Sequence, residues 1–130
     1  MKKDFDNWNI SKQQIHTNSD GPLFHEREIW FCSLGVNIGF EQDGTGSKYD
    51  RPILIMKGFN THTFFCAALV GRKKEAWPYF YIGTVTGRDA SVNLSQVRTL
   101  DTKRLIKKIG MLDKETYEKV KGNLQKRLFT

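Results

Sequence analysis

From Glu28 onward the chain consists of short strand-like runs separated by stretches rich in Gly, Asp and Lys. The runs cover residues 29–34, 51–57, 62–69, 79–83 and 90–100. Short apolar runs bounded by turn-forming residues are typical of strands. This pattern predicts an antiparallel β-barrel or sandwich. A chain of 130 residues has room for one such compact domain.

A helical pattern precedes the strands. Residues 4–18 carry Phe5, Trp8 and Ile15 at roughly helical spacing and lead into a turn-rich segment at 18–22. We therefore expect an N-terminal helical extension with a linker over residues 1–24, and a barrel domain over residues 25–130.

Two further helices are expected after the last strand. Asp101 or Thr102 can cap a short helix that runs to Ile109 and ends at Gly110. On such a helix four basic side chains share one side: Lys103, Arg104, Lys107 and Lys108. The last helix begins with Asp113 as its N-cap and carries an apolar stripe of Tyr117, Val120, Leu124 and Leu128.

The charge of the chain favours a polyanionic partner or simply good solubility. The net charge is +7, and residues 101–130 hold nine basic and four acidic side chains, so that segment contributes +5. The apolar runs are far shorter than the roughly 20 residues that span a bilayer, and no signal peptide is visible. We expect a cytoplasmic protein without membrane contact.

The residues that most often bind metals are scattered along the chain. Cys32 and Cys66 each lie within an apolar run, which favours buried free thiols. The three histidines, His16, His25 and His62, show no zinc-ligand spacing with these cysteines and favour surface positions. We expect no metal and no cofactor.

The longest interruption between strands, residues 35–50, contains four glycines among polar residues. Long loops within compact domains are usually functional. This segment is a candidate lid over a binding site.

Three segments in this order resemble the PemK/MazF (Kid-like) family of type II toxin–antitoxin toxins. They are REIWFCSLGVNIGFEQDG at 27–44, RPILI at 51–55 and SVNLSQVRTLDTKRLIKKIG at 91–110. The resemblance implies a mainly β (α+β) fold, an SH3-like β-barrel of the PemK/MazF/CcdB type. It also implies a homodimer, RNA and DNA binding, metal-free cleavage of single-stranded RNA, growth inhibition and a cognate antitoxin. Gyrase-poisoning toxins share this barrel.

Metal-free RNA cleavage by the 2′-hydroxyl needs a proton acceptor, a proton donor and groups that stabilise the charged transition state. Arg51, at the junction of loop and strand, resembles the catalytic arginine of the family and suits the third role. Glu41 resembles the loop glutamate of the family, which orients the arginine or accepts a proton. A solvated surface charge is the simpler interpretation of each of these two residues.

Candidate RNA-binding residues lie in three places. Gln42 follows Glu41 in the loop, and Gln96 and Arg98 share one face of the strand at 90–100. Arg72 and Lys73 begin a basic loop that is followed by an aromatic-rich strand, and basic groups beside aromatic rings suit unstacked RNA bases. Some members of the family carry an acidic residue where Ser95 stands, and Asp101 is a reserve proton acceptor, although a helix cap explains it more simply.

The main departure from the family pattern is Val70-Gly71, where active members usually carry a Thr-Ser or similar hydroxyl pair. A hydroxyl directed at the scissile phosphate is therefore missing, unless Thr45 or Ser47 in the loop replaces it. Two further functions remain open beside an endoribonuclease toxin. One is a catalytically impaired protein that binds RNA or antitoxin, and the other is an inhibitor of a protein target such as a topoisomerase.

Overall fold

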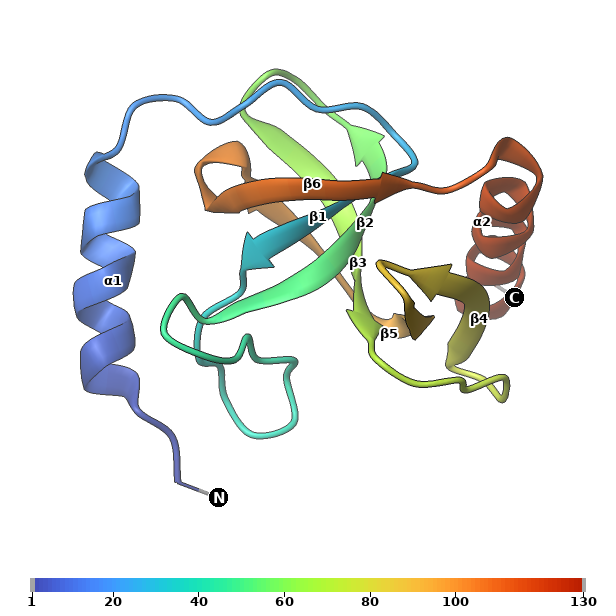
Figure 1. Ribbon diagram of the computed structural model, residues 1–130, viewed down its shortest axis with the longest axis horizontal. Coiled ribbons are helices and arrows are strands. Elements are labelled where there is room, and N and C mark those ends of the chain that lie inside the picture. Colours follow the sequence, from blue (N-terminus) through green and yellow to red (C-terminus); the bar gives the residue numbers. More distant parts are fainter. Residues whose placement is uncertain (1, 130) are drawn as a thin grey trace.

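The computed structural model describes residues 2–129, and it is mainly β with one helix on each side of a strongly coiled sheet (Figure 1). The helices are α1 (Phe5–Thr17) and α2 (Lys114–Leu128). The strands are β1 (Glu28–Ser33), β2 (Asp50–Gly58), β3 (Thr63–Val70), β4 (Tyr79–Val85), β5 (Arg88–Asp101) and β6 (Leu105–Met111). All neighbours are antiparallel in the order β4-β5-β3-β2-β1-β6. The predicted β-barrel class and the first five strands are confirmed.

Side chains of the central strands fill two cores, one on each face of the sheet. In β2, Ile53 and Ile55 enter one core and Leu54 and Met56 enter the other, as the period of two in a strand requires. The first core also contains Cys32 and Cys66, both free, as predicted. Burial raises the pKa of the Cys32 thiol to about 12 and also raises that of Cys66, so both thiols stay protonated.

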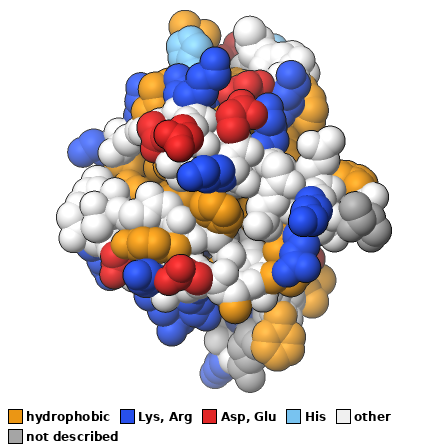
Figure 2. All heavy atoms as spheres, turned by 90° about the vertical axis from the view of Figure 1, so that its right-hand side faces the viewer, with side chains coloured by type: hydrophobic (Ala, Val, Ile, Leu, Met, Phe, Trp, Pro, Cys, Tyr) orange, Lys and Arg blue, Asp and Glu red, His pale blue; other side chains and the backbone are white. Residues whose placement is uncertain are grey.

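The second core lies under α2, where three of the four residues of the predicted apolar stripe pack onto the sheet and the fourth, Leu128, is exposed. Tyr117, Val120 and Leu124 are buried there, and Asp113 caps the helix by accepting from Thr116 N at 2.9 Å, as predicted. The exposed side of α2 carries acidic and basic side chains close together (Figure 2), with Lys119 and Lys121 paired to glutamates. The positive charge of the C-terminal segment is therefore locally compensated on this helix.

The predicted helix over residues 101–109 is wrong. Only the 3-10 turn η1 (Thr102–Arg104) forms, with Asp101 accepting from Lys103 N at 2.8 Å, and the chain then pairs as β6 with β1. The sequence of this segment has the spacing of an amphipathic helix, but β1 otherwise has an unpaired edge, so non-local backbone hydrogen bonds decide the outcome. The basic side predicted for that helix does not form, and Lys108 instead pairs with Glu28 at 3.0 Å.

The strand β5 is bent by a bulge. Asn93 pairs with Ala68 while Val97 pairs with Ala67, so three residues bulge out between them. A bulge lets a long strand turn and increases its twist. Gln96, one of the three bulged residues, contacts the loop at 35–50.

No helix in residues 2–129 is long and apolar enough to cross a membrane.

The Tyr117 hydroxyl donates a buried hydrogen bond to the backbone oxygen of Met56. We expect Tyr117→Phe to lower the free energy of unfolding by about 1–3 kcal/mol, because the buried carbonyl loses its partner. Urea denaturation measures this. Tyr81→Phe is the matched control, since that hydroxyl donates to an exposed carboxylate of Asp89, and its effect should be clearly smaller. Equal effects would contradict the assignment of Tyr117 as a buried anchor.

Candidate active site

Arg51 is placed by a closed loop. The loop at 35–50 folds back on itself through reciprocal backbone hydrogen bonds between Thr45 and Asp50, at 2.9 and 3.0 Å. At Gly44 a Cβ atom would lie 1.6 Å from the Tyr49 carbonyl oxygen, so only glycine permits this close crossing of the chain. The crossing brings the residues before Gly44 beside the first residues of β2.

The guanidinium of Arg51 is held by backbone oxygens from both sides. Its Nε donates to Asp43 O at 2.7 Å, and Nη1 donates to Leu69 O at 3.2 Å. In the amide orientation that satisfies both groups, the Gln42 side-chain oxygen accepts from Nε and Nη2 at 3.1 Å each. Burial lowers the pKa of Arg51 and the Asp43 carboxylate opposes that shift, but an arginine remains a cation at neutral pH.

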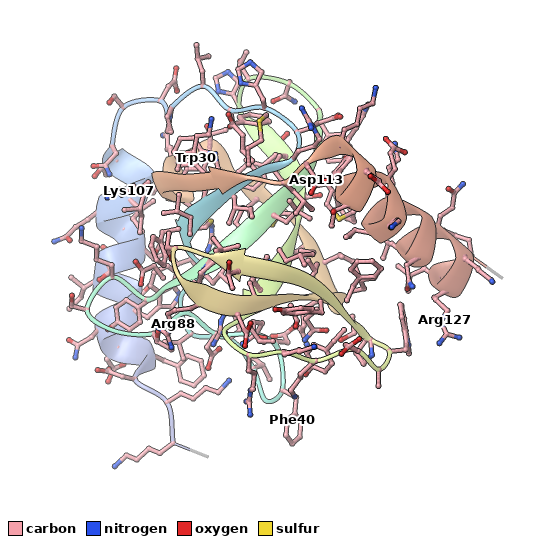
Figure 3. All side chains as sticks on the ribbon, turned by 45° about the vertical axis from the view of Figure 1, so that its right-hand side comes forward. Trp30, Phe40, Arg88, Lys107, Asp113 and Arg127 are labelled. Atoms are coloured by element: carbon pink, nitrogen blue, oxygen red, sulfur yellow. The ribbon has the colours of Figure 1, made fainter. Side chains whose placement is uncertain are left out.

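Arg51 borders a cavity of about 320 Å³ between the loop, the end of β3 and the turn from β4 to β5. Val70 and Gly71 lie in its wall, together with Thr45 and Asp50. The β4–β5 turn contributes three polar residues that the sequence analysis did not single out: Thr86, Arg88 and Asp89. Arg88 is exposed at this turn, in front of the sheet in Figure 3.

The turn itself was detectable in the sequence. Thr86 and Gly87 both have positive φ, as a two-residue type I′ hairpin turn requires, and the glycine at the second position between two strand-like runs is the signal for such a turn. What the sequence does not indicate is that this turn closes over the start of β2.

A sequence profile of the PemK-like, MazF-like toxins of type II toxin-antitoxin systems matches residues 25–128. The chain belongs to this family. It is 30% identical over 107 residues to the endoribonuclease EndoA of Bacillus subtilis (strain 168), a match that covers 75% of this chain and 88% of that protein.

Solved structures share the fold. The MazF crystal structure (Form-I) from Deinococcus radiodurans superposes with a TM-score of 0.69 at 18% identity, covering 84% of this chain and 99% of that one. An endoribonuclease in complex with its cognate antitoxin from Mycobacterial species gives a TM-score of 0.58 at 18% identity, covering 83% and 95%. At these identities the likeness concerns the fold.

Within this PemK/MazF fold, Gln42 rather than Glu41 faces Arg51. The exposed Glu41 carboxylate accepts from Ile38 N at 2.9 Å, and Glu41 N donates to Ile38 O at 3.0 Å. Glu41 therefore closes a turn of the loop, and Gln42 is the residue directly after that turn. The sequence order alone does not distinguish which of the two neighbours points inward.

Gln96 ties β5 to the loop, whereas Arg98 lies elsewhere. Gln96 Oε1 accepts from Gln42 N at 3.0 Å, and its Nε2 donates to Phe40 O at 3.2 Å. Phe40 itself projects away from the molecule into solvent (Figure 3). Arg98 is half-buried beyond the bulge and near Arg104, whose pKa is lowered mainly by burial and further by Arg98.

The basic loop after β3 lies beside aromatic rings of β4. Lys73 Nζ is 5.1 Å from the ring centre of Tyr81, and Lys74 Nζ is 4.3 Å from that of Tyr79. Arg72 is exposed, and its backbone oxygen accepts from Ser91 Oγ at 2.7 Å. The loop is thus fixed by its backbone while its cations stay at the surface.

Val70 and Gly71, where the family resemblance leads us to expect a hydroxyl pair, lie in the wall of the cavity. Val70 is half-buried, and a Cβ atom at Gly71 would meet only Arg88 Nη2 at 3.8 Å, so a side chain fits there. Of the two loop hydroxyls considered as substitutes, Thr45 borders this cavity, while Ser47 borders another with Lys48 and Arg104.

The crossing at Gly44 is testable by stability. We expect Gly44→Ala to cost about 1–3 kcal/mol of unfolding free energy, because the new methyl group overlaps the backbone of Tyr49. Gly122→Ala on α2 is the control, since nothing lies within 4 Å of its Cβ position, and it should stabilise by up to about 1 kcal/mol. Thermal and urea unfolding give both values. An unchanged free energy of unfolding in Gly44→Ala would show that the chain does not cross so closely at Gly44.

Proposed function

We propose that this chain is a growth-inhibiting toxin that cleaves single-stranded RNA without a metal ion, using the 2′-hydroxyl of the RNA as the nucleophile. The observation that carries the proposal is Arg51, a cation fixed by backbone carbonyls at the edge of an open cavity in a PemK/MazF fold. Family membership and the likeness to a named endoribonuclease support it.

In the proposed reaction the 2′-oxygen attacks the phosphorus and the bond to the 5′-oxygen breaks, which leaves a 2′,3′-cyclic phosphate and a 5′-hydroxyl. Negative charge builds up on the phosphate oxygens in the transition state. Arg51 has five N–H donors, and the bonds to Asp43, Leu69 and Gln42 leave one N–H on each terminal nitrogen. Those two groups are available to the phosphate.

The remaining roles follow from the lining of the cavity. Asp50 and Asp89 are its carboxylates. One of them accepts the proton of the 2′-hydroxyl, and the leaving 5′-oxygen takes its proton from water. Glu41 supports the site indirectly, through the turn that presents Gln42. Gln42, Gln96, Arg72 and Lys73 bind the RNA on either side of the cavity. Arg98 has no part in this site, because it lies beyond the bulge and near Arg104.

The absence of a hydroxyl at Val70 sets the expected rate. Removing one donor to a transition-state oxyanion typically costs about 10²–10³ in rate. We therefore propose slow cleavage with ordinary RNA affinity. A protein that binds RNA or antitoxin without cleaving it is the alternative outcome of the experiment below.

Partners follow from the family. Two of the similar structures are complexes: an endoribonuclease with its cognate antitoxin from Mycobacterial species, and MazE-MazF (Form-II) from Deinococcus radiodurans. We propose a cognate antitoxin for this chain, a cytoplasmic site of action and a homodimer. Large apolar side chains on the surface, such as Ile38, Phe40 and Phe129, supply apolar area for such contacts.

Restoring the hydroxyl pair should raise the rate. We expect Val70→Thr with Gly71→Ser to increase single-turnover cleavage of an unstructured RNA by about 10²–10³, with RNA affinity and thermal stability nearly unchanged. Val and Thr have nearly the same shape, and the Gly71 site is open. The assay contains a chelator to exclude metal-dependent nucleases.

Two controls accompany this assay. Arg51→Ala in the doubly substituted chain should abolish the gain, and single-stranded DNA of the same sequence should bind without being cut because it lacks the 2′-hydroxyl. A wild-type chain that cuts fast and gains nothing would place the active site elsewhere. A doubly substituted chain that binds RNA but never cuts it would favour the binding-only alternative.

The basic loop should contribute to the salt dependence of RNA binding. We expect replacement of Arg72, Lys73 and Lys74 by Ala to reduce the slope of log affinity against log salt by about 2, since each lost phosphate contact on a single strand contributes about 0.7. Fluorescence anisotropy with a labelled RNA measures the slope. Replacing Lys119 and Lys121, which pair with glutamates on α2, should leave it unchanged. Equal slopes for all three proteins would remove the loop from the binding surface.

A further inference from the structure

The segment before residue 25, outside the family match, is attached to the loop that holds Arg51. Lys3 Nζ donates to Asn37 O at 2.6 Å and to Gly39 O at 2.8 Å, and it lies 3.0 Å from Asp43 Oδ2. Only 9% of the Lys3 side chain is exposed. An ammonium group with three donors is thus matched by three oxygens of one loop.

One of these oxygens leads directly to Arg51. Asp43 binds Lys3 through Oδ2 and accepts from Asn37 N through Oδ1 at 2.7 Å, so both carboxylate oxygens are fixed. The backbone oxygen of the same residue accepts from Arg51 Nε at 2.7 Å. Lys3 therefore fixes the residue whose carbonyl orients the guanidinium.

The contact also has an electrostatic consequence. The Asp43 carboxylate lies close enough to Arg51 to oppose the fall in its pKa. An uncompensated carboxylate at this place opposes the negative charge that builds up on the phosphate in the transition state, and in a partly buried site such repulsion is weakly screened. Lys3 supplies the compensating charge.

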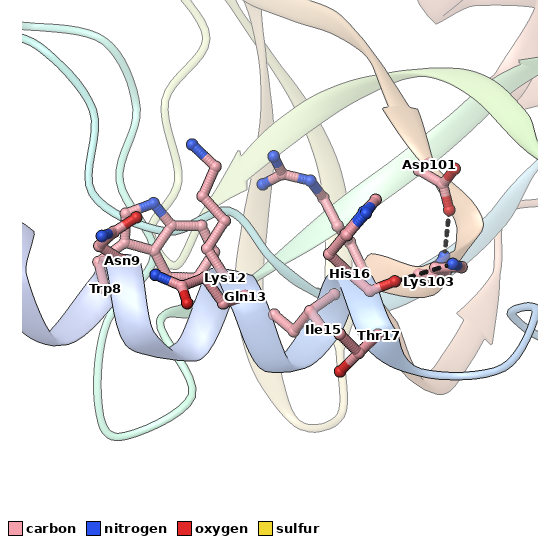
Figure 4. A pocket seen from close by; sticks show the side chains of 10 residues that line it. Trp8, Asn9, Lys12, Gln13, Ile15, His16, Thr17, Asp101 and Lys103 are labelled. Atoms are coloured by element: carbon pink, nitrogen blue, oxygen red, sulfur yellow. Dashed lines mark hydrogen bonds between the residues drawn. The ribbon is translucent and has the colours of Figure 1, made fainter.

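The helix α1 is held on the barrel independently of Lys3. Trp8 is buried against Gly35 and lies 5.3 Å from the ring centre of Tyr49, so it packs at both ends of the loop. At the other end of α1, Lys103 Nζ donates to His16 O at 3.0 Å, beside a cavity of about 610 Å³ (Figure 4). A change at Lys3 should therefore leave α1 in place.

We propose that Lys3 is a positioning residue for Arg51, acting through Asp43, so that the N-terminal extension is part of the active-site machinery. The inference rests on the proposed RNA cleavage. It concerns a residue 48 positions before Arg51 in the chain, outside the family match.

The test compares Lys3→Met with Lys2→Met in the full chain. Both remove one positive charge from the same segment, but Lys2 is exposed. The first readout is solvent exchange of the Arg51 Nε–H proton by nitrogen-15 NMR, which reports the bond to Asp43 O directly. The second is the single-turnover cleavage rate beside the RNA affinity, measured with the unstructured RNA in the Val70→Thr, Gly71→Ser chain as well as in wild type.

We expect Lys3→Met to speed exchange of the Arg51 Nε–H proton several-fold and to lower the cleavage rate by about tenfold or more, with less than about a threefold change in affinity. Lys2→Met should change none of the three. Asp43→Asn should also speed exchange of the Arg51 Nε–H proton and lower the cleavage rate. Combining it with Lys3→Met should lower the rate little further, because the two residues act on Arg51 as one unit.

Unchanged exchange in Lys3→Met overturns the proposal, as does faster exchange with an unchanged rate. An equal loss of cleavage rate in Lys2→Met overturns it too, since that would show a general effect of charge. A chain that fails to cut RNA in every background refutes the proposed function instead, and the exchange measurement then decides by itself whether Lys3 orients Arg51.

Discussion

Two backbone carbonyls, those of Asp43 and Leu69, fix the one guanidinium around which the site is organised. They come from different parts of the fold, the end of a loop and the end of β3. Their positions depend on the closed loop and on the register of β2 with β3. The Leu69 oxygen belongs to the sheet, and the Asp43 oxygen belongs to a loop closed by backbone hydrogen bonds. The arginine is therefore oriented before a substrate arrives, and such preorganisation is a main source of electrostatic stabilisation in enzymes.

The distribution of charge follows from the same arrangement. Cations that bind backbone oxygens, such as Arg51 and Arg104, are half-buried, whereas those of the loop after β3 remain at the surface above aromatic rings. On α2 the lysines are paired with glutamates. The net charge of +7 thus includes cations fixed on backbone oxygens, cations paired with glutamates and exposed cations. In the loop after β3, Lys73 is paired with Glu75 at 3.5 Å, whereas Arg72 is exposed and suited to contact with a polyanion.

Local patterns in the sequence predicted most of the fold and part of the site. Strands with a clear period and a helix with an Asp cap were predictable because their signals are local, as at Asp113. The segment after Asp101 was not, because its pairing with β1 depends on residues more than 70 positions away. Arg51 and Val70 were found through the family resemblance. The bond from Lys3 to Asp43 was missed because 40 residues separate the partners and a lysine near a terminus carries no local signal.

The departure at Val70 changes what the rest of the site must supply in the proposed reaction. With a hydroxyl present, transition-state charge is shared between that group and the guanidinium. Without it, the two free N–H groups of Arg51 carry a larger share, and the rate depends more strongly on their orientation. Contacts that orient Arg51, including those from Lys3 through Asp43, should therefore affect the cleavage rate more in this chain than in a member of the family that has the hydroxyl pair. An added hydroxyl at position 70 should accordingly make the rate less sensitive to Lys3, which is a coupling that a double-mutant cycle can measure.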